Sequence, residues 1–232
     1  MQIIERLPRE TGRHYALRIL RWNIINFGLL PGALLSENEL AAEMGLSRMP
    51  VREALIELSK VKIVEILPQR GSMVSLIDST LIEEARFMRE VLESAIVRLM
   101  AETATPEMIA ELEDNIRLQE YYLGQDQPQK IPELDREFHK RIYVLTGKAE
   151  IYDLMRQMTI HHERVSVLCR RILPTEETVS DHRRIMEAIA RHDPDEAERQ
   201  TKQHLCKQPA MDLYLREQYS AYFKQPTSRR RK

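Results

Sequence analysis

Two short helices separated by one glycine constrain the fold of this chain more than any other feature. The first, SENELAAEM at residues 36–44, opens with a capping-box pattern, because Ser36 is followed three residues later by a glutamate. Gly45 ends that helix, and Ser47 can cap a second one that begins with RMPVREALIEL. Helix, tight glycine turn and helix together predict a helix-turn-helix motif.

The flanking segments extend this motif to a winged helix. Residues 13–27 place apolar side chains on one helical stripe, and we expect Gly28 to close that helix. After the second helix of the motif come KIVEIL, the turn PQRG and SMVSL, a pattern typical of two strands joined by a turn that contains Gly71. We therefore expect a winged helix-turn-helix DNA-binding domain over residues 1–76.

Two arginines, Arg48 and Arg52, lie four residues apart at the start of the motif's second helix. The N-terminus of such a recognition helix enters the major groove, where Arg binds guanine through two parallel hydrogen bonds. Ser47 can contact a phosphate, and Arg70 at the tip of the wing can contact the backbone or the minor groove. These residues predict DNA binding. The alternative is a winged helix that binds protein and carries the arginines as solvent-exposed charges.

The segment PGALLSENELAAEMGLSRMPVREALIELSKVKIVEILPQRGSMVS resembles the winged helix of GntR-superfamily bacterial transcription regulators. The resemblance implies operator binding as a homodimer. Two positions depart from the family pattern: Met49 stands where relatives usually carry a phosphate-contacting threonine, and Lys62 stands where a glycine normally follows the recognition helix. A non-glycine residue is destabilising at positive φ. The candidate DNA-binding residues are Ser47, Arg48, Met49, Arg52, Arg70 and Gly71.

Residues 79–224 are expected to form an all-helical domain, and the family resemblance implies that this domain binds an effector and dimerises. Apolar residues recur at spacings of three and four through LIEEARFMREVLESAIVRLMAET, and helix-start signals that contain proline divide the rest of the region. These signals predict six or seven helices in an antiparallel bundle, so the fold class is mainly α. Residues 225–232, which include RRRK, are expected to be a disordered basic tail.

Four side chains in the helical region predict a metal site. Asp135 and His139 are four residues apart and therefore lie on one face of one helix, while His182 and His204 belong to two further helices. Carboxylate and imidazole suit a divalent ion such as Zn²⁺, Ni²⁺ or Mn²⁺. From the residues alone, a helix-surface pair or a histidine that is hydrogen-bonded in the core stays open as the alternative.

The helical region also resembles the metal-binding, all-helical ligand domain of the FadR subfamily, the FCD type. In that pattern an Asp-x-x-x-His pair is joined by a histidine before an x-x-I-x-x-A-I helix and by another near the end of the next helix. The resemblance implies four ligands, Asp135, His139, His182 and His204. It also makes Arg89 the counterpart of an arginine that faces the effector pocket. Arg164, in HHERVSVLCRR, is a second effector-binding candidate.

These features predict a bacterial transcription regulator, a repressor, whose operator affinity is controlled by a small organic acid bound beside a divalent metal. The chain shows no signal-peptide pattern and no apolar run near 18 residues, so we expect a cytoplasmic protein with no membrane contact. The alternative is a metal-dependent hydrolase or other enzyme with a winged-helix partner domain. Against an enzyme, no acid/base carboxylate stands beside the metal residues in a motif such as H-E-x-x-H.

Overall fold

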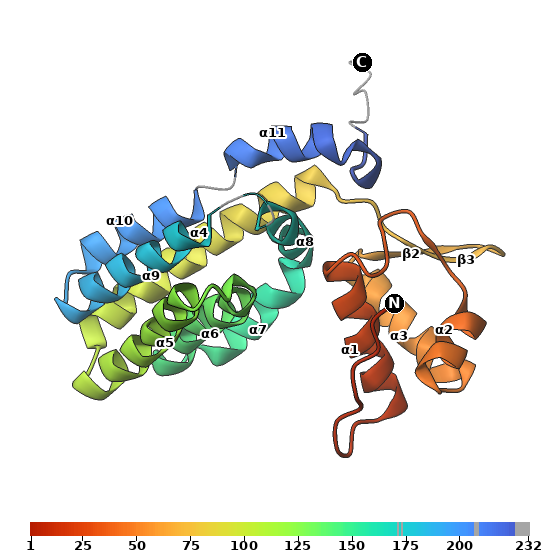
Figure 1. Cartoon of the computed structure of the whole chain (residues 1–232), viewed down its shortest axis with the longest axis horizontal. Helices are drawn as coiled ribbons and strands as arrows, with labels where there is room; N and C mark the ends of the chain where they lie inside the picture. Colours follow the sequence, from red (N-terminus) through yellow and green to blue (C-terminus); the bar gives the residue numbers. More distant parts are fainter. Residues whose placement is uncertain (171, 173, 207–208, 226–232) are drawn as a thin grey trace. The chain divides into compact units, whose positions relative to one another are not determined.

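Three helices build the N-terminal part of the computed structural model, which describes residues 1–170, 172, 174–206 and 209–225 (Figure 1). They are α1 (Gly12–Ile25), α2 (Glu37–Met44) and α3 (Arg48–Lys60), and both α1 and α2 pack against α3. Ser36 caps α2, since its hydroxyl accepts a hydrogen bond from the Glu39 N–H at 3.4 Å. Gly45 ends α2 at φ 64°. The predicted helix-turn-helix is confirmed.

The end of α1 differs from the expectation that Gly28 closes it. The helix ends at Ile25, and Phe27 is the residue in the left-handed region, at φ 62°. Gly28 has a different role, because a Cβ atom there would lie 2.3 Å from Oδ1 of the buried Asn23. That amide oxygen accepts a hydrogen bond from the Gln2 N–H, so the missing side chain at Gly28 leaves room for a contact to the N-terminal segment.

The wing is a three-stranded antiparallel sheet. Its strands are β1 (Leu34–Leu35), β2 (Val64–Leu67) and β3 (Gly71–Val74), and β3 lies between the other two. The two longer strands are those predicted from KIVEIL and SMVSL. Strand β1 was not predicted, because LLPGALL is typical of a turn and its two strand residues pair only with Met73 and Ser72 of β3.

Lys62 follows α3, at the position where the family pattern has a glycine, and it adopts φ 63°. This confirms the expectation of a strained turn, which costs about 1 kcal/mol for a residue with a Cβ atom. The Lys62 N–H donates to the Ser59 carbonyl at 3.0 Å, and the Ile63 N–H donates to the Leu58 carbonyl at 3.2 Å. The turn therefore satisfies carbonyls at the end of α3 while it redirects the chain into β2.

The remainder of the described chain is helical, and the fold is mainly α with a winged helix-turn-helix followed by a bundle, as predicted. The elements are α4 (Ser79–Thr103), α5 (Pro106–Gly124), η1 (Pro128–Lys130), α6 (Ile131–Leu145), α7 (Ala149–Met158), α8 (Ile160–Cys169), α9 (Thr175–Ala190), α10 (Pro194–Leu205), α11 (Pro209–Gln218) and η2 (Ser220–Tyr222). Among these described helices, none combines the length and apolar character that crossing a membrane requires.

Helices α5, α6, α9 and α10 form the part of the bundle that matters for the site, with α5 against α6 and α9, and α9 against α10 (Figure 1). Thr105 caps α5 and Asp193 caps α10, each directly before a proline, which confirms these two helix starts. The apolar core is shared by α4, α5, α6, α7, α9 and α10. Its fully buried members include Met100, Ala101, Leu112, Ile116, Phe138 and Ile189.

Two compact units emerge from the contacts, and their boundaries differ from a single division near residues 76–79. The helical unit is Glu83–Thr159 with Cys169–Met211. The winged-helix unit is Met1–Ile82 together with Ile160–Leu168 and the described residues from Asp212 on. Ile160 of α8 belongs to the apolar core of the winged helix, and Ile77 pairs with Phe223. Residues 226–232 of the expected basic tail lie outside the described residues.

Candidate metal centre and DNA-binding surface

The structure brings together the four side chains that the sequence singled out as metal ligands. Asp135 and His139 project from one face of α6, His182 comes from α9 and His204 from α10. One ligand atom from each lies within 4.8 Å of those of the other three. Three helices far apart in the sequence therefore converge on one point with one carboxylate and three imidazoles.

Two of the three imidazoles present an unpartnered nitrogen to this point. His139 and His182 are 7% and 0% exposed, and their Nε2 atoms lie 3.9 and 3.3 Å from Asp135 Oδ1. Neither contact has the geometry of a hydrogen bond. Both Nε2 atoms are therefore buried without a hydrogen-bond partner among the described residues. A buried, unsatisfied nitrogen is unfavourable, so this arrangement fits a ligand that accepts a lone pair.

A chain of amides determines which nitrogen of His182 carries the proton. The Leu134 carbonyl accepts from Asn115 Nδ2 at 3.2 Å, and Asn115 Oδ1 accepts from Gln119 Nε2 at 2.7 Å. Gln119 Oε1 is therefore an acceptor, and it lies 2.9 Å from His182 Nδ1. Since that contact needs a donor, the proton of the neutral imidazole lies on Nδ1 and the lone pair lies on Nε2.

Carboxylate oxygens lie beside Nδ1 of the other two histidines, as the amide oxygen of Gln119 does for His182. Glu93 Oε2 lies 2.8 Å from His139 Nδ1, and Asp181 Oδ2 lies 3.2 Å from His204 Nδ1. Glu93 is itself paired with Arg89, whose Nε donates to Glu93 Oε1 at 2.7 Å. His182 and His204 thus have hydrogen-bond acceptors at Nδ1, and His139 has an ion-pairing carboxylate there, so that Nε2 is left to a metal ion in each ring.

Burial and local charge together set the protonation states at the centre. Burial would raise the pKa values of Glu93 and Asp135, but Arg89 and His139 beside Glu93, and the histidines beside Asp135, His182 foremost, hold both pKa values well below their usual range. Burial lowers the pKa of His182 to about 4. It would do the same to His139, but the adjacent charge of Glu93 raises the pKa of that imidazole. Ionised carboxylates and a neutral His182 are the forms that bind a cation, and His139 loses its proton on metal binding.

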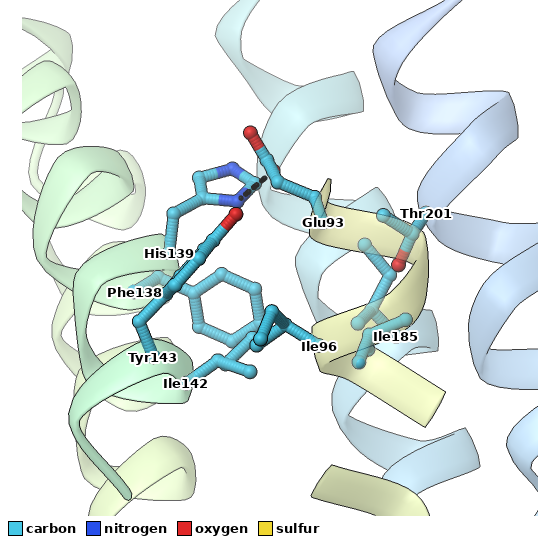
Figure 2. A pocket seen from close by; sticks show the side chains of 9 residues that line it. Glu93, Ile96, Phe138, His139, Ile142, Tyr143, Ile185 and Thr201 are labelled. Atoms are coloured by element: carbon cyan, nitrogen blue, oxygen red, sulfur yellow. Dashed lines mark ion pairs between the residues drawn. The ribbon is translucent and has the colours of Figure 1, made fainter. Parts of the chain in front are cut away.

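A small cavity of about 10 Å³, room for roughly one water molecule, borders this centre. Figure 2 shows Phe138, His139, Ile142 and Tyr143 facing it from α6, Glu93 and Ile96 from α4, Ile185 from α9 and Thr201 from α10. Apart from Glu93, His139, the tyrosine and the threonine, the labelled lining is apolar. The cavity therefore places an apolar wall directly beside the polar cluster.

The two arginines expected in the effector pocket lie in different units. Arg89 on α4 is paired with Glu93, and its pKa is influenced by the charge of Asp135, which places it beside the cluster. Arg164 on α8 belongs to the winged-helix unit, where its Nη1 donates to the Ser75 carbonyl at 2.9 Å. The structure thus brings Arg89, and not Arg164, to the four candidate ligands.

The residues expected to contact DNA lie on exposed parts of the winged helix. Arg48, Met49 and Arg52 are exposed on the first turns of α3, and Arg48 Nε is paired with Glu37 of α2. Ser47 occupies the N-cap position but makes no capping hydrogen bond with its side chain. The Ser47 hydroxyl therefore makes no hydrogen bond that caps α3 and can contact a phosphate instead. Arg70 and Gly71 are exposed where β2 turns into β3.

The residues around the ligands were not predicted individually from the sequence, although each carries a signal. Glu93 is four residues after Arg89 on the same helix. Asn115 and Gln119 are likewise four residues apart and form a buried polar pair on an otherwise apolar face of α5. Asp181 directly precedes His182. A search for polar pairs with helical spacing inside apolar helix faces would have found the first three.

Comparison with known proteins matches both units to one kind of protein. Residues 16–74 match the family described as bacterial regulatory proteins, gntR family, and residues 84–206 match the FCD domain. The HTH-type transcriptional repressor RspR of Escherichia coli (strain K12) is 30% identical over 217 residues, which cover 93% of this chain and 95% of RspR. An HTH-type transcriptional regulator from an unstable DNA locus of Streptomyces ambofaciens is 33% identical over 209 residues, covering 84% of this chain and 83% of the relative.

The fold is also similar to a solved structure, E. coli McbR/YncC, with a TM-score of 0.75 at 21% identity over 90% of this chain and 99% of the other. The matches do not support the alternatives of an enzyme or of a winged helix that serves only to bind protein. The chain belongs to the GntR family of DNA-binding transcription regulators, with an FCD domain as its C-terminal half, and is not an enzyme.

Proposed function

We propose that this regulator is a homodimeric repressor that binds operator DNA through α3 and the wing, and that a small carboxylate bound at the metal centre changes its affinity for that DNA. One observation carries the proposal. Ligand atoms of three imidazoles from three helices gather with one carboxylate, and each imidazole has an amide or carboxylate oxygen within 3.2 Å of its Nδ1. Structural packing alone does not require this arrangement of buried, unsatisfied nitrogens.

The donor set supports a resident divalent ion, Zn²⁺, Ni²⁺ or Mn²⁺, held by Asp135, His139, His182 and His204. Three imidazoles and one carboxylate suit these borderline ions better than Ca²⁺ or Mg²⁺. A bound ion supplies positive charge to which a ligand carboxylate can coordinate. The ligands themselves tie α6 to α9 and α10, so metal binding contributes to the stability of the helical unit.

Arg89 is the residue of this chain best placed to bind the effector carboxylate. Its guanidinium is anchored through Nε to Glu93, at the edge of the cluster. A guanidinium carries five N–H donors and a permanent positive charge, and both attract a carboxylate. A carboxylate bound beside the four ligands would therefore meet two sources of positive charge. FCD domains bind small effector ligands, and the repressor RspR supports the assignment of repression.

On the DNA side, Arg48 and Arg52 lie on successive turns at the N-terminus of α3, where recognition helices contact base edges. Ser47, Met49, Arg70 and Gly71 are exposed around them. Ser47 is proposed to contact a phosphate and Arg70 the backbone or the minor groove. Two winged helices are needed for a pseudo-palindromic operator, and a dimer supplies them. Exposed apolar side chains on α4 and α7, among them Phe87, Val91, Leu154 and Met158, offer faces that pairing would cover.

Metal content tests the centre directly. The wild-type chain, purified without chelators, is compared by elemental mass spectrometry with a variant that combines His139→Ala and His182→Ala. We expect about one metal ion per chain in the wild type and none in the variant. His14→Ala, which changes an exposed histidine of α1, is the matched control and should retain the metal. A metal-free wild type would overturn the metal centre and leave the DNA-binding assignment intact.

DNA binding is tested with duplexes selected from a random pool by the wild-type protein. Arg52→Ala should weaken binding to the selected duplex and relax its preference at one base step, at a cost of about 1–3 kcal/mol. Arg98→Ala in the helical unit removes a surface arginine that pairs with Asp195 and Glu198, and should leave DNA binding unchanged. Binding should also weaken steeply with salt, because phosphate contacts release counterions. Equal binding by wild type and Arg52→Ala would show that the recognition helix is misplaced.

A further inference from the structure

Arg164 is the most unusual charged residue of the described chain, because it is 0% exposed and most of its guanidinium is unpaired. Its Nη1 donates to the Ser75 carbonyl at 2.9 Å. Its Nε and Nη2 atoms are buried and have no hydrogen-bond partner among the described residues. Nε and Nη2 form one edge of the guanidinium, and this edge binds an oxoanion through two parallel hydrogen bonds.

The charge of Arg164 persists in this environment. Burial lowers the pKa of Arg164 to about 10, which leaves the guanidinium protonated at neutral pH. No carboxylate of the described residues forms an ion pair with it. Removing a charge from water is unfavourable unless a partner of opposite charge and hydrogen bonds compensate for the lost hydration. The edge therefore has the character of an anion site that no carboxylate of the described residues fills.

His161, one turn before Arg164 on α8, adds an acceptor. Its Nε2 lies 3.1 Å from the Lys62 carbonyl, so the proton of the neutral ring is on Nε2. Burial and the nearby charge of Arg164 lower the pKa of His161 to about 4, so the ring is neutral at neutral pH. Its Nδ1 lone pair is buried without a partner, as is the hydroxyl of Ser75. The three residues thus offer N–H and O–H donors together with one acceptor.

We propose that Arg164, with His161 and Ser75, forms an oxoanion site in the winged-helix unit, separate from the metal centre. The donors of the guanidinium edge suit two oxygens of a carboxylate or phosphate. The acceptor at His161 suits an anion that also carries a hydroxyl, so the ligand class is hydrogen phosphate or a hydroxycarboxylate. No part of this inference depends on the proposed metal or on the effector of the helical unit.

Occupancy of this site would affect the DNA-binding surface. Helix α8 touches the winged helix through Ile160 in its core, through His161 at the turn after α3, and through Arg164 at the end of the wing. An anion on the Arg164 edge neutralises the charge that opposes this packing. It therefore stabilises α8 against the turn that follows the recognition helix and against the strand that leads out of the wing.

The test uses the full-length His139→Ala, His182→Ala protein, so that binding at the metal centre cannot contribute. Inorganic phosphate and, separately, lactate are titrated in a Tris-chloride buffer of constant ionic strength, by calorimetry and by thermal unfolding. We expect saturable binding of one anion per chain and a melting temperature that rises with its concentration. Arg164→Gln should abolish both effects, and Arg98→Gln, at a partly exposed arginine of the helical unit, should retain them.

If Arg164→Gln does not fold, Arg164→Lys replaces it in the test, because lysine keeps the positive charge but cannot form two parallel hydrogen bonds. The affinity of Arg164→Lys for the anion should be lower than that of the parent protein by about tenfold or more. Binding of phosphate alone, of lactate alone or of both supports the site and identifies its ligand. The proposal is overturned if neither anion binds to the parent protein, or if Arg164→Lys binds as tightly as the parent. Both outcomes leave the metal and operator assignments untouched.

Discussion

Glu93 offers the sharpest test of how the metal centre is built, because it contacts the candidate ligands without being one of them. Its Oε2 lies 2.8 Å from His139 Nδ1 and its Oε1 accepts from Arg89 at 2.7 Å, and the residue is only 4% exposed. The change Glu93→Gln keeps the size of the side chain but removes its charge. It also offers a single oxygen where the carboxylate places one oxygen beside His139 and the other on Arg89.

The expected loss follows from these contacts. With a neutral amide beside it, His139 is less firmly held in the orientation and tautomer that present Nε2, and its basicity falls. Substitution of such an outer partner typically weakens metal binding about 10–100-fold. This range corresponds to about 1.4–2.7 kcal/mol of binding free energy. Arg89 also loses its anionic partner, so part of the loss is expected to appear in the stability of the metal-free protein.

Competition with a chromophoric chelator measures the metal affinity of wild type and Glu93→Gln under the same conditions. Glu111→Gln is the matched control, because Glu111 is an exposed glutamate whose carboxylate is paired with Arg141, 2.8 Å from its Nη1. The control should bind metal as the wild type does. A folded Glu93→Gln protein whose affinity lies within about twofold of the wild type would refute the role assigned to Glu93.

Three further outcomes are expected. Gln119→Met removes the acceptor for His182 Nδ1 and should weaken metal binding about tenfold in the same chelator assay; unchanged affinity would contradict the amide chain. The pKa of His161 is about 4 when folded and near 6.5 when unfolded, so the unfolded chain gains protons first as pH falls, and stability is lost from pH 6.5 toward 4. Between pH 6.5 and 5 the wild type should lose about 1.5 kcal/mol more than His161→Gln in urea unfolding, and parallel curves would argue against a neutral, buried ring. Lys62→Gly should raise the free energy of unfolding by about 1 kcal/mol because it relieves the positive φ, whereas Lys60→Gly, within α3, should lower it by a similar amount.

The winged helix could be predicted from sequence because its signals are local. A capping serine, a left-handed glycine and a turn between two short apolar strands each act within a few residues, and α2, α3, β2 and β3 all form where those signals lie. Strand β1 has no such signal, since two residues become a strand only through pairing with β3. The end of α1 shows the same limit: Phe27, not a glycine, adopts the left-handed conformation there.

The candidate metal ligands could also be predicted, since helical spacing places Asp135 and His139 on one face whatever the rest of the fold does. Their partners could not, because contacts such as that of Glu93 with His139 join residues 46 positions apart in the sequence through packing of α4 on α6. The location of Arg164 could not be predicted for the same reason. Nothing local distinguishes an arginine that faces an effector pocket from one buried against Ser75.

The path of the chain through the two units has a consequence for dissecting the protein. The backbone passes between the units at four points, after Ile82, Thr159, Leu168 and Met211. A fragment cut after residue 82 would lack α8, and with it Ile160 of the winged-helix core and the partner of the Lys62 carbonyl. Exchange of N-terminal halves between such regulators would therefore need α8 and the segment from Asp212 to be transferred as well, because the DNA-binding unit is assembled from three separate stretches of chain.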